Sequence, residues 1–263
     1  MLKKSGLKLW AVLLWLIVWQ LASMAVGKEI LLVSPIRTIT RLAELASALS
    51  FWKAILYTLS RIALGFTLAT ALGVLLAILS SRFSSIRDIC APAMLTIKTI
   101  PVASFIIVAL IWFSSKKLSI LISFLMVLPI IYTNTLNGIL AADPQLIEMA
   151  RVFRIPVFRQ ILYVYGPQVL PYFRTGCTLA LGLSWKSGVA AEVIGMPVGS
   201  IGERLQQAKV YLDTPDLFAW TLTIILVSLL FERGILFLLH CLERRLTHIG
   251  SSECSTQLTR EAV

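Results

Sequence analysis

Long apolar segments alternate with short polar connections along almost the whole chain. A helix needs about 20 apolar residues to cross the roughly 30 Å hydrocarbon layer of a bilayer. Segments that approach this length are Leu9–Val26, Ala54–Leu79, Ala93–Phe113, Leu118–Leu140, Val169–Ile194 and Leu217–Leu239. The pattern therefore predicts an all-α integral membrane protein with about six transmembrane helices.

The first apolar segment also fits a second interpretation, that of a removable leader. It follows Lys3, Lys4 and Lys8 and contains Ala22-Ser23-Met24, a weak cleavage site. A signal peptide has the same order of a basic region, an apolar region and small residues. The length of the segment favours an uncleaved anchor.

The polar connections divide the chain into three predicted parts. Residues 1–53 form an N-terminal transmembrane anchor and an outer amphipathic segment. Residues 54–246 form a core of five spans, which includes a long connection at residues 143–168. Residues 247–263 are polar, and we expect them to form a disordered tail.

Two connections on the predicted outer side are longer than a turn requires. Residues 34–53 begin with Ser34-Pro35, a helix-start signal, and then read as an amphipathic surface helix. Residues 195–216 are rich in Gly and Pro and surround a short helical centre. Both connections are candidates for an outer surface that another molecule contacts.

Composition agrees with a membrane protein and limits the other classes. Of 263 residues, 58% are hydrophobic and 14% are charged, against about 45–50% and 25% in soluble domains. The net charge of +11 does not indicate nucleic-acid binding, because the Lys and Arg residues lie between the spans rather than in one patch. If the amino terminus is placed inside the cell, 12 basic residues lie on the inner side of the membrane and 8 on the outer side. This excess favours cytoplasmic termini, because positive charge gathers on the inner side. The cysteines lack CxxC spacing, so we expect free thiols.

The connection at residues 143–168 has its own helical pattern. Asp143-Pro144 is typical of an N-cap followed by proline at the first helical position. The helix should reach about Arg154, since Ile155 precedes a proline. At 100° per residue, apolar and polar side chains fall on opposite arcs, with Glu148 and Arg151 close enough to pair. By itself this pattern fits either an interfacial helix on lipid or a docking surface for a cytoplasmic partner.

Two stretches of the sequence carry a resemblance to a known family. Glu148-Met149-Ala150-Arg151, followed by Gly166-Pro167 and Leu170-Pro171, resembles the EAA loop of permease subunits of bacterial ATP-binding-cassette (ABC) importers. The run TGCTLALGLSWKSGVAAEVIG at Thr175–Gly195 is similar to the sulfonate, taurine, nitrate and bicarbonate branch of these permeases. The resemblance covers most of the chain from about residue 55.

The resemblance implies a role for the connection at residues 143–168, as cytoplasmic coupling helices that seat in a groove of an ATPase subunit. Glu148, Ala150 and Arg151 match the family motif, and Phe153 belongs to the same helix. Arg154 stands where the family usually has Gly. The implied partners are two ATPase subunits, an extracytoplasmic solute-binding protein and a second permease copy, in the bacterial inner membrane.

Motifs for catalysis or nucleotide binding are absent from the sequence. It contains no G-x-x-x-x-G-K-[ST], which ATP hydrolysis by this chain would require, and no GxSxG or HExxH. We therefore expect no enzyme, no cofactor and no metal site, and the energy for transport would come from a separate subunit.

Polar residues inside the predicted spans are the candidates for a solute path. Lys186 lies in the fifth predicted span between Trp185 and Ser187, and a charge there is costly unless it has a function or a partner. Lys186 could attract an anionic solute such as a sulfonate, or it could be a snorkelling side chain. Asn134 and Asn137 in the fourth predicted span could line the path or join helices by hydrogen bonds.

The sequence therefore predicts the permease subunit of an importer of a small, anionic solute. An autonomous secondary carrier or channel is the alternative, and it would usually show inverted repeats, which we do not find. A non-transporting scaffold would leave Lys186 without a purpose.

Overall fold

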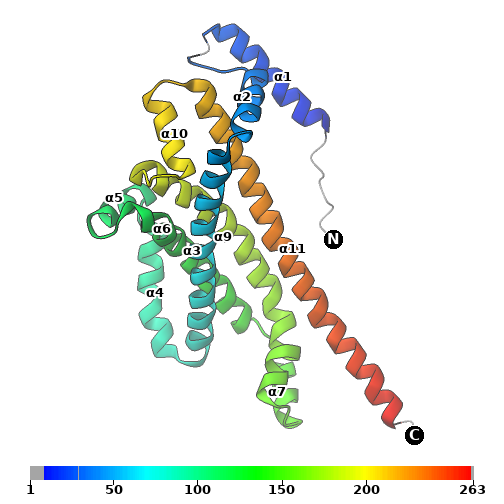
Figure 1. Cartoon of the computed structure of the whole chain (residues 1–263). Helices are drawn as coiled ribbons and strands as arrows, with labels where there is room; N and C mark the ends of the chain where they lie inside the picture. The colour runs from blue at the N-terminus through cyan, green and yellow to red at the C-terminus, as the bar shows by residue number, and fades with distance from the viewer. Residues whose placement is uncertain (1–8, 29, 262–263) are drawn as a thin grey trace.

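The computed structural model describes residues 9–28 and 30–261, and it describes side chains over residues 10–28 and 30–241. Within these residues the chain is all-helical, which confirms the predicted fold class (Figure 1). The helices are α1 Leu9–Val26, α2 Pro35–Ala46, α3 Leu49–Arg82, α4 Ser84–Thr99, α5 Val102–Trp112, α6 Ser115–Leu140, α7 Pro144–Val152, α8 Val157–Arg159, the π-helical turn η1 Gln160–Tyr165, α9 Gly166–Gly195, α10 Ile201–Val210 and α11 Thr214–Glu261.

Helices α3, α6 and α9 pack side by side and form the centre of the molecule (Figure 1). Glycines bring them close: a Cβ at Gly65 of α3 would lie 2.6 Å from the carbonyl oxygen of Ile120, and one at Gly138 of α6 would lie 3.0 Å from Cβ of Tyr172. Such close approach lets helices pack where lipid provides no hydrophobic driving force. Their shared core contains Phe66, Ala69, Ala77, Met94, Val127, Leu128, Ile131, Tyr132, Leu136, Cys177, Ala180 and Leu181.

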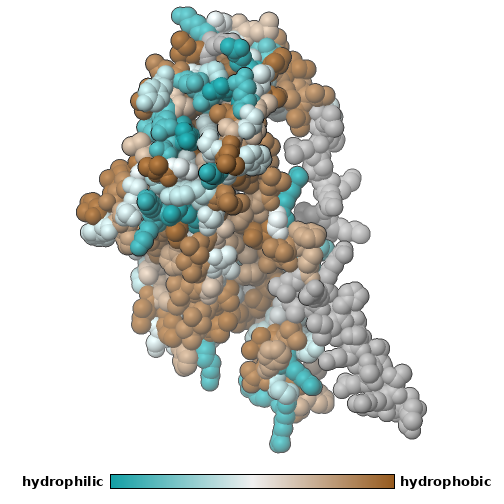
Figure 2. All heavy atoms as spheres, viewed as in Figure 1, coloured by the Kyte–Doolittle hydropathy of each residue, from teal (hydrophilic) through white to brown (hydrophobic). Residues whose placement is uncertain are grey.

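The two ends of the molecule carry different elements. Helix α7 and the α3–α4 turn lie at one end, whereas α2 and α10 lie at the other (Figure 1). Figure 2 shows hydrophobic side chains over the middle of the molecule and hydrophilic ones gathered toward the α2–α10 end and near α7. This distribution is the one expected of a chain whose middle lies in hydrocarbon.

The predicted count of six spans is not confirmed. Among the described residues, α3, α6 and the part of α11 up to Cys241 are long and apolar enough to cross a membrane, and α4 with α5 would make a fourth span. This pair is bent by 106°, where we expected one straight span at Ala93–Phe113. The bend follows from Pro101, because the residue before a proline is pushed out of the helical region, and Ile100 has ψ of 129°.

The first and fifth predicted spans also differ from simple apolar spans. Helix α1 has the predicted bounds, but its described apolar part is shorter than that of the other spans. Helix α9 has 30 residues and carries Arg174, Lys186 and Glu192. It is not among the helices that are both long and apolar enough to cross a membrane. Length alone would allow α9 to cross a bilayer.

Both outer connections contain the helices that the sequence predicts. Ser34 caps α2, since its hydroxyl accepts a hydrogen bond from the backbone N–H of Arg37. Helix α10 is the predicted helical centre of residues 195–216.

The described carboxyl-terminal residues belong to the last helix. The segment for which the sequence predicts disorder, residues 247–263, has its described residues in α11, which continues to Glu261, and the prediction of disorder stays a prediction. Extending an existing helix adds one hydrogen bond per residue without a new nucleation cost, and this part of the chain contains no proline.

Candidate functional site

Helix α7 begins as the sequence predicts. The Asp143 carboxylate accepts a hydrogen bond from the backbone N–H of Gln145 at 2.8 Å, and Pro144 occupies the first helical position. Proline is tolerated there because its missing N–H would have no partner inside the helix. The start of α7 is therefore fixed by its own sequence.

The end of α7 lies two residues before the predicted end at Arg154. Arg154 has φ of 50°, in the left-handed region. The N–H of Ile155 donates to the carbonyl of Ala150 at 2.9 Å, and the N–H of Arg154 donates to the carbonyl of Arg151 at 3.0 Å. These two bonds form a Schellman motif, whose left-handed residue is usually Gly. Arg154 thus takes the conformation for which the family's Gly is suited.

Helix α7 exposes most of its side chains. Ala150 is 1% exposed, whereas Glu148 and Arg151 are exposed and form no pair with each other, contrary to the prediction. The predicted apolar arc is also not buried as a whole, since Phe153 at its end is 73% exposed. Further exposed apolar side chains around this loop are Leu146, Met149, Val152, Val157, Phe158 and Ile161.

One side-chain hydrogen bond ties the start of the loop to α9, and a second one lies within the loop. The N–H of Asp143 donates to Oε1 of Gln168 at 2.7 Å, and Nε2 of Gln160 donates to the carbonyl of Ile155 at 2.8 Å. The fifth span is predicted to begin at about Val169, but α9 begins at Gly166 and η1 runs directly into it. Helix α7 is thus linked to α9 by the Asp143–Gln168 bond and, beyond the turn at residues 153–156, by the continuous segment from α8 through η1.

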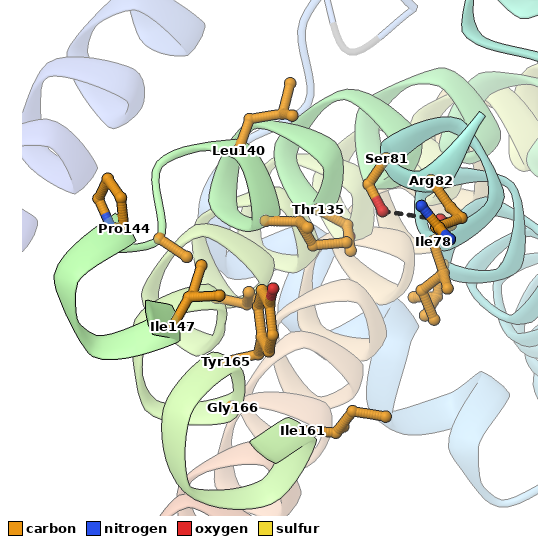
Figure 3. A pocket seen from close by; sticks show the side chains of 14 residues that line it. Ile78, Ser81, Arg82, Thr135, Leu140, Pro144, Ile147, Ile161, Tyr165 and Gly166 are labelled. Carbon is orange, nitrogen blue, oxygen red and sulfur yellow. Dashed lines mark hydrogen bonds between the residues drawn. The ribbon is translucent and has the colours of Figure 1, made fainter. Parts of the chain in front are cut away.

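A cavity of about 560 Å³ lies behind α7 (Figure 3). Pro144 and Ile147 of α7 face it from one side, and Ile78 and Arg82 of α3 face it from another. The other lining residues are Val74, Ser81, Thr135, Ile139, Leu140, Ala142, Ile161, Tyr165, Gly166 and Val169. The cavity therefore lies between α7, the junction of η1 with α9, and the ends of α3 and α6.

The residues predicted to line a solute path do not lie together. Trp185 and Ser187 are buried, at 2% and 3% exposure, on the face of α9 that packs against α3 and α6, whereas Lys186 is exposed. Asn137 is exposed on α6, and Asn134 is half-buried with its Nδ2 donating to the carbonyl of Ile130 at 2.9 Å.

Helix α9 presents one exposed stripe that includes Lys186. Its members recur at helical spacing along the helix: Tyr172, Thr175, Leu179, Leu183, Lys186 and Ile194. Among the described side chains, Lys186 has no hydrogen-bond or ion-pair partner. A cation on an otherwise apolar, uncovered stripe is the arrangement expected if another helix or an aqueous path adjoins it.

Polar residues at the opposite end join elements that are far apart in sequence. The Arg41 guanidinium of α2 bonds to Asp216 at the start of α11 and to Glu44, and these hydrogen bonds raise the pKa of Arg41. Fully buried Glu192 of α9 contacts Thr58 of α3, 134 residues away. The sequence does not identify Thr58 as the partner of Glu192, because nothing in an apolar span distinguishes one hydroxyl from the others.

The described side chains contain no group of three or more His, Cys, Asp and Glu residues placed to hold a metal ion. Comparison with known proteins then decides the family. Residues 69–248 match the family described as binding-protein-dependent transport system inner membrane component. The chain belongs to this family.

Individual relatives agree with this assignment. The putative aliphatic sulfonates transport permease protein SsuC of Bacillus subtilis is 29% identical over 82% of this chain and 78% of its own length. A probable ABC transporter permease protein of Brucella melitensis is 30% identical over 72% of this chain and 76% of its own length. The taurine transport system permease protein TauC of Escherichia coli is 27% identical over 87% of this chain and 84% of its own length.

The family assignment confirms the resemblance read from the sequence. The chain is a permease of this family, a helical membrane protein of transport, and its relatives include permeases named for aliphatic sulfonates, taurine and bicarbonate. The matched region contains α7, the cavity behind it and all of α9 and α10.

Proposed function

We propose that this permease couples ATP hydrolysis by a separate ATPase subunit to the import of a small anionic solute, with α7 as the coupling helix. The observation that carries the proposal is the geometry of α7: a capped helix that is exposed, basic and apolar at its tip, and fastened to a membrane-length helix. An autonomous carrier would have no use for such a surface.

The tip of α7 has the composition of a protein-binding surface. Phe153 and Phe158, at 73% and 75% exposure, lie next to Arg151, Arg154 and Arg159. Aromatic residues and Arg are enriched at the centres of protein interfaces, where most of the binding energy is found. A lipid surface is the other occupant that such a helix could have, and the test below separates the two.

The coupling route runs from α7 through the loop into α9. Closure of two ATPase subunits on ATP would draw the α7 helices of two permease copies together. The Asp143–Gln168 hydrogen bond and the unbroken segment from α8 to α9 would transmit this movement.

Two copies of the permease would enclose the path, with the exposed stripe of α9 facing it. Lys186 would then attract the solute, and its charge would be neutralised during passage rather than left in lipid. Relatives named for aliphatic sulfonates and for taurine support an anionic solute. A solute-binding protein would deliver the solute at the α2–α10 end, and the α7 end and both termini would be cytoplasmic.

A charge reversal on α7 tests the coupling assignment. Glu148→Lys should abolish ATP-driven uptake in cells while the protein still inserts at normal abundance, since Glu148 is exposed and supports no contact in the fold. Asp88→Lys is the matched control, because Asp88 is an exposed acid on α4 near the same end of the molecule. Uptake that survives Glu148→Lys would show that α7 is not the coupling helix.

A second variant tests the path. Lys186→Ala should lower the uptake rate of an anionic solute without changing ATP hydrolysis by the assembled transporter. Wild-type uptake by a Lys186→Ala protein of normal abundance would contradict the role of Lys186. Transport by the permease alone in vesicles, without an ATPase subunit, would favour a secondary carrier or channel instead.

A further inference from the structure

The connection between α9 and α10 forms a tight hairpin at the end of the molecule opposite α7 (Figure 1). Helix α9 ends at Gly195, Met196 follows in a left-handed conformation with φ of 44°, and α10 begins at Ile201. So short a connection fixes where α10 starts but leaves its direction open. Contacts at the first turn of α10 must set that direction.

A buried carboxylate supplies the first of these contacts. Glu192, in the last turn of α9, is fully buried, and its Oε2 accepts a hydrogen bond from Oγ1 of Thr58 at 2.7 Å. The same oxygen accepts a longer bond from the N–H of Gly202 at 3.4 Å, and Oγ1 of Thr58 accepts one from the N–H of Ile201 at 3.0 Å. The first N–H groups of α10, which have no partner inside the helix, are thus bonded to α9 and α3.

A glycine allows this contact to be close. A Cβ added at Gly202 would lie 2.5 Å from the carbonyl carbon of Glu192 and 2.6 Å from the backbone nitrogen of Val193. The first turn of α10 therefore rests directly on the backbone of α9. Only a residue without a side chain fits there in this conformation.

The far end of α10 has no comparable attachment. Val210, Tyr211 and Leu212 are 67%, 80% and 73% exposed. Ile201 at the beginning is fully buried, in a cluster with Phe51, Ala54 and Trp220. Helix α10 is therefore bonded through side chains at its amino-terminal turn, whereas Ala208 near its other end is buried by packing alone and the residues that follow are exposed.

The carboxylate has unused bonding capacity. Oε1 of Glu192 is buried without a hydrogen-bond partner, and so is the hydroxyl of Ser119 on α6, which lies against the same carboxyl group. An unsatisfied buried acceptor costs free energy, so a purely structural contact would be better served by a fully bonded or apolar group. A small shift of α6 relative to α9 would bring the Ser119 hydroxyl into a hydrogen bond with Oε1 of Glu192.

We propose that Glu192 and Thr58 form a latch that holds α10 against α3 and α9 in this conformation, and that the latch opens and re-forms during transport. Glu192 and Thr58 are positioning residues, because they act through α10 and not on the solute. The role of α10 as an outer gate rests on the proposed function, whereas the latch itself rests only on these contacts.

The first experiment measures whether the latch holds α10. A reporter cysteine replaces Ala208, which is 6% exposed on α10, in a chain whose native cysteines are changed to Ala. We expect Thr58→Val to raise the rate of labelling by a membrane-impermeant maleimide about ten-fold, because removing one partner of a buried hydrogen bond shifts an equilibrium by about that factor. Thr58→Ser keeps the hydroxyl and should label like the wild type.

The control is a hydroxyl on the same helix that makes no contact with α10. Thr67 of α3 is exposed and donates to the carbonyl of Leu64 at 3.0 Å. Thr67→Val should change the labelling rate less than two-fold. Equal labelling of Thr58→Val and Thr67→Val would overturn the latch. If Thr58→Val does not fold, the labelling rate of Thr58→Ala is compared with that of Thr58→Ser, which serves as the folded reference.

A second readout separates a moving latch from a static one. In the transporter assembled with its ATPase subunit, a non-hydrolysable ATP analogue should change the labelling of the Ala208→Cys reporter at least three-fold, and Thr58→Val should remove this difference. Unchanged labelling in a transporter that imports solute with ATP would overturn the gate role and leave the proposed function standing. Absence of ATP-dependent uptake in that preparation would instead overturn the proposed function.

Discussion

The left-handed conformation of Arg154 leads to a prediction about the end of α7. Arg154 has φ of 50° at the residue that follows the cap of α7. A residue with a Cβ pays roughly 1–2 kcal/mol for this conformation, and Gly pays about 0.5–1 kcal/mol more than other residues for being ordered. Arg154→Gly should therefore stabilise this turn by about 0.5–1 kcal/mol, the difference between the two costs.

Hydrogen exchange measures this turn directly. The N–H groups of Arg154 and Ile155 donate to carbonyls inside α7, so both exchange only when the turn opens. Since about 1.4 kcal/mol corresponds to a factor of ten, Arg154→Gly should slow exchange in peptides that cover residues 150–155 about two- to five-fold. Arg154→Val should speed it, because a β-branched residue is strongly disfavoured at positive φ.

Arg159→Gly is the matched control for this measurement. Arg159 is another exposed arginine of the same loop, but its φ is −70°, in the right-handed helical region. Glycine there has a cost and no benefit, so exchange around residue 159 should become faster. If Arg154→Gly also speeds exchange, side-chain contacts of Arg154 hold the turn and the strain argument is wrong.

Three further predictions concern packing and surface charge. Gly65→Ala should lower the stability of the folded permease by about 1–3 kcal/mol, measured as thermal unfolding in detergent, because its Cβ would lie 2.6 Å from a carbonyl oxygen of α6. Ile147→Phe faces the cavity behind α7 and should leave the unfolding temperature nearly unchanged, whereas Ile131→Phe in the fully buried core should lower it. Asp216→Asn should cost less than about 1 kcal/mol and less still in high salt. The pKa of Arg41 is raised in the folded protein, so the stability that its ion pair contributes is fully present at any pH below the pKa of an unperturbed arginine. The stability linked to Arg41 should therefore not change between about pH 7 and pH 10.

The starts of helices could be predicted wherever the sequence carries a strong local capping signal. Asp143-Pro144 and Ser34-Pro35 mark the starts of α7 and α2 because capping and proline geometry act over a few residues. The bend at Pro101 follows from equally local chemistry, but the apolar run around it favoured one straight span. Hydropathy measures affinity for lipid and carries no information on backbone direction.

Contacts between distant residues could not be predicted in this way. Glu192 was visible as a charge in a span, but its partner Thr58 was not, since their hydrogen bond depends on how α3, α9 and α10 are arranged. Trp185, Lys186 and Ser187 were grouped because they are adjacent in sequence, although successive residues of a helix point about 100° apart. Which of them are buried depends on how α9 packs against its neighbours. The family resemblance supplied the role of α7, and physical reasoning about that helix alone left lipid and protein as equal occupants.

The central claim is that the tip of α7 contacts an ATPase subunit, and site-specific photocrosslinking tests it most directly. A photoreactive amino acid replaces Phe153 at the tip of α7 or, as a control, Tyr211 at the end of α10, which is 80% exposed at the opposite end of the molecule. We predict a crosslink from position 153 to the ATPase subunit and none from position 211. A crosslink from position 211 with none from position 153 would contradict the account.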